Sequence, residues 1–160
     1  MRTRLFTLCL LPLLGCLACV SATPRSSGPS PVDWPSYNGS LEGTRYSPLA
    51  QITPANAAAL ERVCTFDSGE QMSMQSGPVV VNGVLYVTTD TSTYAIDAAT
   101  CRRIWHTARS YPSPAFLKNN HGVAYMDGRL FRVNGGVRAY ALDASSGRVL
   151  WDVSFRERDG

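Results

Sequence analysis

Outside its first 22 residues, the sequence contains two histidines and two cysteines, namely His106, His121, Cys64 and Cys101. These residue types are common metal ligands and frequent catalytic bases or nucleophiles. Compact metal sites often place such residues close together in the chain, as in His-x-x-x-His and Cys-x-x-Cys. Neither spacing occurs here, so we expect no metal site and no catalytic site that this chain could build alone.

A twelve-residue stretch and its repeat organise the rest of the chain. Residues 94–105 read Tyr-Ala-Ile-Asp-Ala-Ala-Thr-Cys-Arg-Arg-Ile-Trp, and residues 140–151 read Tyr-Ala-Leu-Asp-Ala-Ser-Ser-Gly-Arg-Val-Leu-Trp. The spacing between Trp105 and Trp151 is 46 residues, and a repeat of about 40–50 residues is typical of four-stranded propeller blades. In each copy an Asp can accept hydrogen bonds from the turn that follows it.

Hairpin signals complete each repeat. Asn82-Gly83 and Asp127-Gly128 each join two short apolar runs, as two-residue hairpin turns do. We predict an all-β fold, an incomplete β-propeller with an N-terminal capping segment and about two four-stranded blades. A sandwich or a plain meander is the alternative. The predicted strands cover residues 78–82, 84–89, 94–97 and 102–105, then 123–126, 129–133, 138–143 and 148–151.

The segment ahead of the repeats carries weaker signals. Thr53-Pro54 predicts a short helical turn that has Thr53 as its N-cap and extends to Leu60. Residues 62–66 predict a strand. We assign residues 33–160 as a whole to the partial propeller.

The N-terminus has the features of an export signal over residues 1–22. Arg2 and Arg4 precede an apolar run, and a small-residue cleavage site ends at Ala22. A second interpretation is a bacterial lipobox at residues 13–16, which would make Cys16 a lipid anchor. The first predicts secretion to the periplasm, the second a membrane-anchored lipoprotein. Residues 23–32 are rich in Pro, Ser and Gly and predict a disordered linker.

The charge balance argues against a nucleic-acid partner. Without the first 22 residues, the chain has 13 basic and 12 acidic side chains and no basic run.

Two parts of the sequence resemble quinoprotein dehydrogenases, which are exported eight-bladed propellers that oxidise alcohols or aldose sugars. Residues 34–38 and 43–49, the latter reading Gly-Thr-Arg-Tyr-Ser-Pro-Leu, resemble the family's N-terminal segment. Both repeats resemble its tryptophan-docking motif, Ala-x-Asp-x-x-Thr-Gly-Lys-x-x-Trp. The resemblance implies pyrroloquinoline quinone (PQQ) as cofactor, with a calcium or lanthanide ion in the full-length parent. The matching positions are Ala95, Asp97, Thr100, Cys101, Arg102 and Trp105, then Ala141, Asp143, Ser146, Gly147, Arg148 and Trp151.

The resemblance also implies cofactor-binding positions, at which this chain departs from the family. Gln75 stands where the family has a Glu that contacts the cofactor, and His121 stands where it has an Arg, after the matching Asn120. Ala115-Phe116 replaces the adjacent cysteines of many alcohol-oxidising members. Gln75, Asn120 and His121 are therefore the candidate cofactor-binding residues.

Two functions remain open. The first is the front part of an exported PQQ-dependent dehydrogenase, in which an alcohol or sugar is the substrate, the remaining blades are partners and this fragment alone is inactive. The second is a non-catalytic, PQQ-like propeller that acts as a periplasmic or outer-membrane scaffold lipoprotein, which would explain the departures.

The docking arrangement that the resemblance implies also suggests a disulfide. In it, the Trp of one repeat stacks on the Gly turn of the next. Cys64 stands at the place of a blade-ending Trp, 41 residues before Trp105, and Cys101 stands where the second repeat has Gly147. We predict that Cys64 and Cys101 form a disulfide in an oxidising compartment; two buried free thiols are the alternative.

Overall fold

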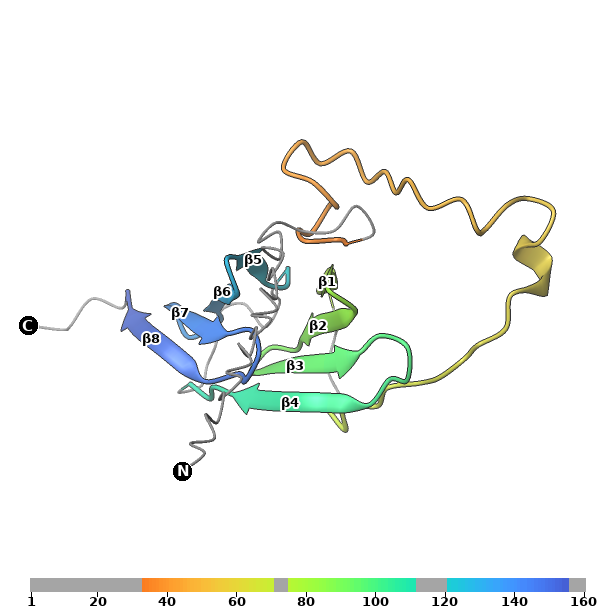
Figure 1. Ribbon diagram of the computed structural model, residues 1–160. Coiled ribbons are helices and arrows are strands. Elements are labelled where there is room, and N and C mark those ends of the chain that lie inside the picture. Colours follow the sequence, from red (N-terminus) through yellow and green to blue (C-terminus); the bar gives the residue numbers. More distant parts are fainter. Residues whose placement is uncertain (1–32, 71–74, 112–120, 156–160) are drawn as a thin grey trace, which may run out of the picture.

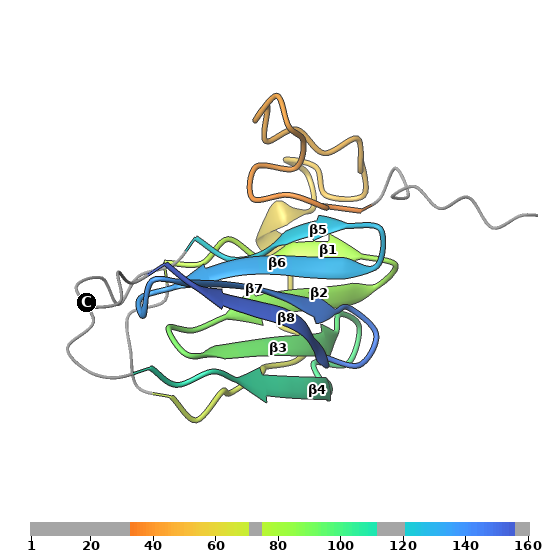
Figure 2. The same ribbon diagram turned by 90° about the vertical axis from the view of Figure 1, so that its left-hand side faces the viewer.

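The computed structural model describes residues 33–70, 75–111 and 121–155. In these residues the chain forms two four-stranded antiparallel sheets, which lie face to face (Figure 1, Figure 2). The first sheet has the order β1 (Val79–Val81), β2 (Val84–Thr88), β3 (Ser92–Asp97) and β4 (Arg103–Ala108). The second has the order β5 (Ala124–Met126), β6 (Arg129–Asn134), β7 (Arg138–Asp143) and β8 (Val149–Ser154). The prediction of an all-β fold with about two blades is confirmed.

Two tight turns set the register of the first hairpin in each sheet. Asn82 and Gly83 have φ of +51° and +75°, and Asp127 and Gly128 have +48° and +74°. A two-residue turn with positive φ at both central residues matches the right-handed twist of the strands that it joins. Both predicted hairpins are therefore present.

Each sheet carries a row of side chains that shares one face. In the first sheet the register pairs Tyr86 with Ala95 and Ala95 with Trp105, so these three side chains lie on the face toward the second sheet. The same row in the second sheet is Phe131, Ala141 and Trp151. No sheet covers this second row within the described residues, and Trp151 is 43% exposed.

The core lies between the two sheets. Its buried members come from both of them, and the fully buried strand positions alternate with exposed ones, as in a sheet covered on one face. Burial of this apolar surface is the main force that holds the sheets together. The buried cluster consists of Val79, Val81, Tyr86, Ala95, Val123, Leu130, Tyr140, Leu142 and Ala144.

The N-terminal segment begins on the first sheet and then leaves it (Figure 1). Trp34 forms an isolated antiparallel bridge with Val80 of β1. The chain then extends away as the orange and yellow segment, which contains the 3₁₀-helix η1 (Ala57–Ala59), and returns to the first sheet at Cys64. The described residues contain no helix of the length and hydropathy that a membrane span requires.

Two local predictions in this segment are wrong. The helical turn is shorter than predicted and its N-cap is Asn56, because the Asn56 side chain accepts a hydrogen bond from the Thr53 N–H (2.7 Å) and donates one to Gln51 O (2.8 Å). This closes a turn ahead of η1, and no buried residue supports a longer helix. Residues 62–66 are extended but form no strand, because no neighbouring strand pairs with their backbone in the described part of the chain.

Candidate functional site

Gln75 and His121, two of the predicted cofactor residues, precede the inner strands of neighbouring sheets. Gln75 leads into β1 and His121 into β5, and both side chains are exposed. The Gly77 N–H donates a hydrogen bond to the His121 carbonyl oxygen (3.3 Å). The two strand entries therefore touch, and we call residues 75–77 and 121–122 the strand-entry site. Asn120, the third predicted residue, lies outside the described residues.

Close backbone packing fixes the strand-entry site. Gly122 has a φ of +110°, and a Cβ added there would lie 2.6 Å from the Gly77 carbonyl oxygen. Only glycine therefore allows this approach. A hydrogen bond of 2.8 Å between the hydroxyls of Ser76 and Thr88 ties the same segment to the end of β2.

A buried arginine joins the two sheets at the same end. Arg132 of β6 is 3% exposed and reaches the β2–β3 turn of the first sheet. Its guanidinium donates hydrogen bonds to Ser92 O (2.6 Å), Thr93 Oγ1 (2.9 Å) and Asp90 O (2.7 Å), and also to Thr89 O. Burial lowers the pKa of Arg132 from its usual value, and the nearby Tyr140 and Asp90 oppose that shift.

Further polar contacts surround this arginine. The Tyr111 hydroxyl donates a hydrogen bond to Asp90, and burial, followed by this hydrogen bond, raises the pKa of Tyr111 to about 12. Arg109, just after β4, and Arg138 of β7 both bind the Asp152 carboxylate, Arg138 at 2.7 Å. The end of the sheets that carries the strand-entry site is therefore held by polar contacts between the sheets.

The strand-entry site has hydrogen-bond donors that suit an acceptor-rich ligand. The Gln75 amide and the His121 imidazole can both donate to carboxylate or quinone oxygens. No acidic side chain lies among residues 75–77 and 121–122, so no carboxylate at the site competes for these donors. These residues thus fit a ligand such as PQQ in donor type. Among the residues that the structure describes, no group of three or more His, Cys, Asp or Glu side chains could hold a metal ion.

The opposite end of the sheets holds a different contact. The Trp105 ring lies against Gly147, where an added Cβ would come within 2.5 Å of the ring. Trp105 Nε1 donates a hydrogen bond to Ala144 O (3.0 Å), and Thr107 Oγ1 donates one to Gly147 O (2.6 Å). The Trp of the first sheet thus contacts the Gly turn of the second.

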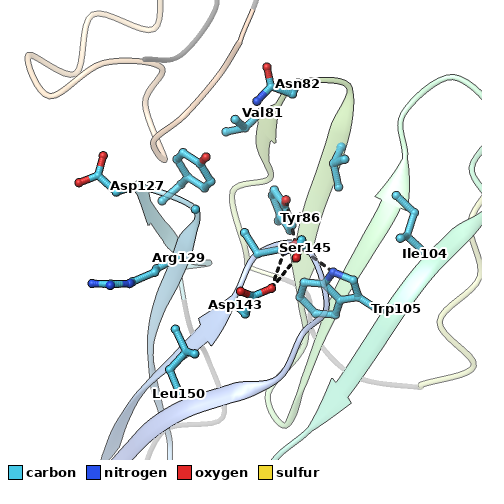
Figure 3. A pocket seen from close by; sticks show the side chains of 14 residues that line it. Val81, Asn82, Tyr86, Ile104, Trp105, Asp127, Arg129, Asp143, Ser145 and Leu150 are labelled. Carbon is cyan, nitrogen blue, oxygen red and sulfur yellow. Dashed lines mark hydrogen bonds between the residues drawn. The ribbon is translucent and has the colours of Figure 1, made fainter. Parts of the chain in front are cut away.

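A groove of about 570 Å³ lies beside this contact (Figure 3). Tyr86 and Trp105 line one of its sides, and Asp127 and Arg129 line the other. It lies at the hairpin end, away from Gln75 and His121, so the strand-entry site and the groove are separate places.

Cys64 and Cys101 form a disulfide with a Cα–Cα distance of 5.8 Å. Cys101 has a φ of +57° and its N–H donates to Asp97 O (2.9 Å); Gly147 has +71° and donates to Asp143 O (2.8 Å). Cys101 and Gly147 therefore occupy the same place in the two turns, as the aligned repeats predict.

Acid is expected to weaken the β7–β8 turn. Asp143 Oδ1 accepts hydrogen bonds from the hydroxyl and backbone N–H groups of Ser145 and Ser146, and these bonds, with the Ser145 hydroxyl first, lower the pKa of Asp143 from 3.8 to about 2. A carboxylate with a lowered folded-state pKa stabilises the fold above its unfolded-state pKa. This contribution is expected to be complete above pH 4 and to disappear as the pH falls from about 4 to about 2.

A ¹³C NMR titration of the Asp143 carboxyl group would measure this shift. In an Asp143→Asn variant, the acid-dependent loosening of the turn should vanish, because no carboxylate remains to titrate. A midpoint at the ordinary Asp pKa of about 3.9 would contradict the prediction.

Sequence reasoning missed two residues near the strand-entry site, Tyr37 and Arg132. Arg132 had a visible signal, since it alternates with Leu130 and Asn134 on the inward face of a predicted strand, where a charge must find partners. Tyr37 had none, because its contacts at Gly77 and His121 are distant in the chain.

Comparison with known proteins bears on this arrangement. Residues 34–153 match the family described as PQQ glucose/ethanol/alcohol dehydrogenase, beta-propeller domain. The 1-butanol dehydrogenase (cytochrome c) of Thauera butanivorans is 36% identical over 146 residues, which cover 87% of this chain and 20% of that protein. The dehydrogenase subunit of the quinone alcohol dehydrogenase of Gluconobacter oxydans is 34% identical over 137 residues, or 82% of this chain and 18% of that protein.

Solved structures agree with the sequence relatives. The quinohemoprotein alcohol dehydrogenase from Comamonas testosteroni superposes with a TM-score of 0.69 at 30% identity, over 81% of this chain and 20% of that chain. A europium-containing methanol dehydrogenase gives a TM-score of 0.69 at 27% identity, over 79% of this chain and 24% of that chain. The chain spans about a fifth of the length of the relatives that it matches. From the family match and the relative that is 36% identical across 87% of the chain, we conclude that the chain belongs to the PQQ-dependent glucose, ethanol and alcohol dehydrogenase family, as part of its β-propeller domain.

Proposed function

We propose that this chain is the N-terminal part of an exported PQQ-dependent dehydrogenase that oxidises alcohols, or aldose sugars, and that it is inactive alone. The observation that supports this most is the contact between the two strand entries, which brings Gln75 and His121 to the same end of neighbouring sheets. The relatives are named as quinone-dependent alcohol dehydrogenases, and the chain spans about a fifth of their length.

In this proposal the chain's residues hold one side of the cofactor. The Gln75 amide and the His121 imidazole donate hydrogen bonds to its oxygens, and Asn120 is a third candidate contact. When bound, PQQ accepts a hydride from the alcohol carbon, so the protein supplies binding and orientation. The calcium or lanthanide ligands and the catalytic residues come from blades outside this chain.

Neutral side chains replace charged ones at two positions of this proposed pocket. Gln75 can donate as well as accept hydrogen bonds, whereas a Glu carboxylate only accepts them. His121 can still donate hydrogen bonds, but it lacks the permanent charge and planar fork of arginine. We therefore expect His121 to contribute less to PQQ affinity than an arginine would.

Removing the His121 imidazole from the complete protein is expected to weaken PQQ binding about tenfold, because the lost hydrogen bond is to a charged ligand. Fluorescence titration with PQQ would measure the dissociation constant, and dye reduction with ethanol, 1-butanol or glucose would measure the activity. Residues 1–160 alone should show neither at micromolar PQQ, since a propeller pocket draws on many blades.

If the complete protein, supplied with PQQ and either Ca²⁺ or a lanthanide, failed to bind PQQ, the dehydrogenase proposal would be wrong. That result would favour the non-catalytic scaffold propeller.

We also propose that residues 1–22 direct export to the periplasm, that residues 23–32 link them to the fold and that residues 33–160 form the partial propeller. Mass spectrometry of the mature protein distinguishes the two export routes. Cleavage after Ala22 would leave an unmodified N-terminus, whereas lipoprotein processing would leave an acylated Cys16 as the first residue.

A further inference from the structure

The chain ahead of β1 forms a loop that is fixed on the first sheet. Trp34 and Val80 exchange two backbone hydrogen bonds, of 2.8 and 2.9 Å. Gly39 then packs against the Trp34 ring, where an added Cβ would lie 3.0 Å from the ring. Residues 34–39 therefore turn back on themselves beside the start of β1.

Arg45 closes this loop. Its backbone N–H donates to Asn38 O (3.0 Å) and its side-chain Nε donates to Asn38 Oδ1 (2.9 Å). Arg45 has a φ of +55°, which is uncommon for a residue with a side chain, so these bonds hold a specific conformation. Asn38 directly follows Tyr37, and fixing Asn38 fixes the backbone at Tyr37.

Tyr37 lies against both halves of the strand-entry site. Its ring contacts the His121 imidazole edge to face, with 5.9 Å between the ring centroids and 76° between the planes. The ring also occupies the space beside Gly77, where an added Cβ would lie 2.2 Å from Tyr37 Cδ2. Tyr37 thus contacts the strand entries of both sheets.

We propose that Tyr37 is a positioning residue for His121. The His121 side chain is exposed and begins a strand, so few other contacts restrict its rotamer. An edge-to-face aromatic contact favours one arrangement by about three- to tenfold. Tyr37 holds the imidazole in the orientation from which it meets the cofactor, and Arg45 keeps Tyr37 in place. The cofactor part of this inference rests on the proposed function; the aromatic contact does not.

The test uses the complete protein with ¹³Cε1-labelled histidine. The His121 signal is assigned by its loss in a His121→Gln variant. In the apo protein, Tyr37→Leu should shift this signal because the ring current of Tyr37 is lost, whereas Tyr37→Phe, which keeps the ring, should leave it nearly unchanged. Tyr37→Leu should also weaken PQQ binding about three- to tenfold, and Tyr37→Phe less than twofold.

Leu41→Ala is the matched control, because Leu41 lies in the same loop and is 98% exposed. It should change neither readout. An unchanged His121 signal in Tyr37→Leu overturns the proposal, and so does an equal loss of PQQ affinity in Tyr37→Phe, since the hydroxyl would then act instead of the ring. If Tyr37→Leu shifts the signal but His121→Gln leaves PQQ affinity unchanged, the positioning contact stands and the cofactor role of His121 is wrong.

Discussion

Replacing Arg132 by methionine is expected to raise the hydrogen-exchange rate of the β2–β3 turn by about 100-fold or more. Methionine keeps the length of the side chain but removes every donor. The carbonyl oxygens of Thr89, Asp90 and Ser92 would lose the buried guanidinium that now binds them. Breaking a buried charged interaction by removing one partner costs about 3–5 kcal/mol, and about 1.4 kcal/mol corresponds to a tenfold change.

Hydrogen exchange measured by mass spectrometry on peptides that cover residues 88–94 reports the local opening of this turn. Arg129→Met is the matched control, since Arg129 is an exposed arginine of the same strand. It should change the exchange rate of the turn less than twofold. If the two variants gave the same exchange rates, Arg132 would not hold the sheets together.

Opening the disulfide is expected to have the second largest effect. The bond closes a loop of 37 residues between Cys64 and Cys101, and such a crosslink stabilises a fold by about 3–4 kcal/mol through the entropy of the unfolded chain. A Cys64→Ser/Cys101→Gly variant isolates the crosslink, because glycine adopts the positive φ of position 101 without strain. Its urea midpoint should fall by about 1–3 M.

The wild-type protein under reducing conditions should unfold close to the variant's midpoint. Alkylation of the exported protein without reductant gives an independent check, in which neither cysteine should react. Two alkylated thiols would show that the cysteines are free.

Local rules explain the parts of the fold that the sequence predicts. Asn82-Gly83 and Asp127-Gly128 set their own turn geometry, and the repeat places each strand relative to these turns. The aligned repeats also pair Cys64 with Cys101, because a contact that recurs between repeats can be transferred by counting residues.

Contacts between distant segments explain what the sequence does not predict. Arg132 interacts with a turn about 40 residues earlier, and Tyr37 contacts the start of β5, more than 80 residues later. The strand predicted at residues 62–66 fails for a related reason, since its type and alternation suit a strand but a strand also needs a partner. The cofactor assignment of Gln75, Asn120 and His121 stays a prediction.

The contact between Trp105 and Gly147 has a direction, because one sheet provides the ring and the next provides the turn. Interfaces of this head-to-tail kind can continue from copy to copy and form open fibres unless they close into a ring. On the first sheet, however, the equivalent turn is already bonded to Cys64, and Phe66 packs on Tyr94 of the face away from the second sheet. The exposed Trp151 of one molecule therefore cannot dock on the first sheet of another in the same way, and the disulfide acts as a stop against polymerisation.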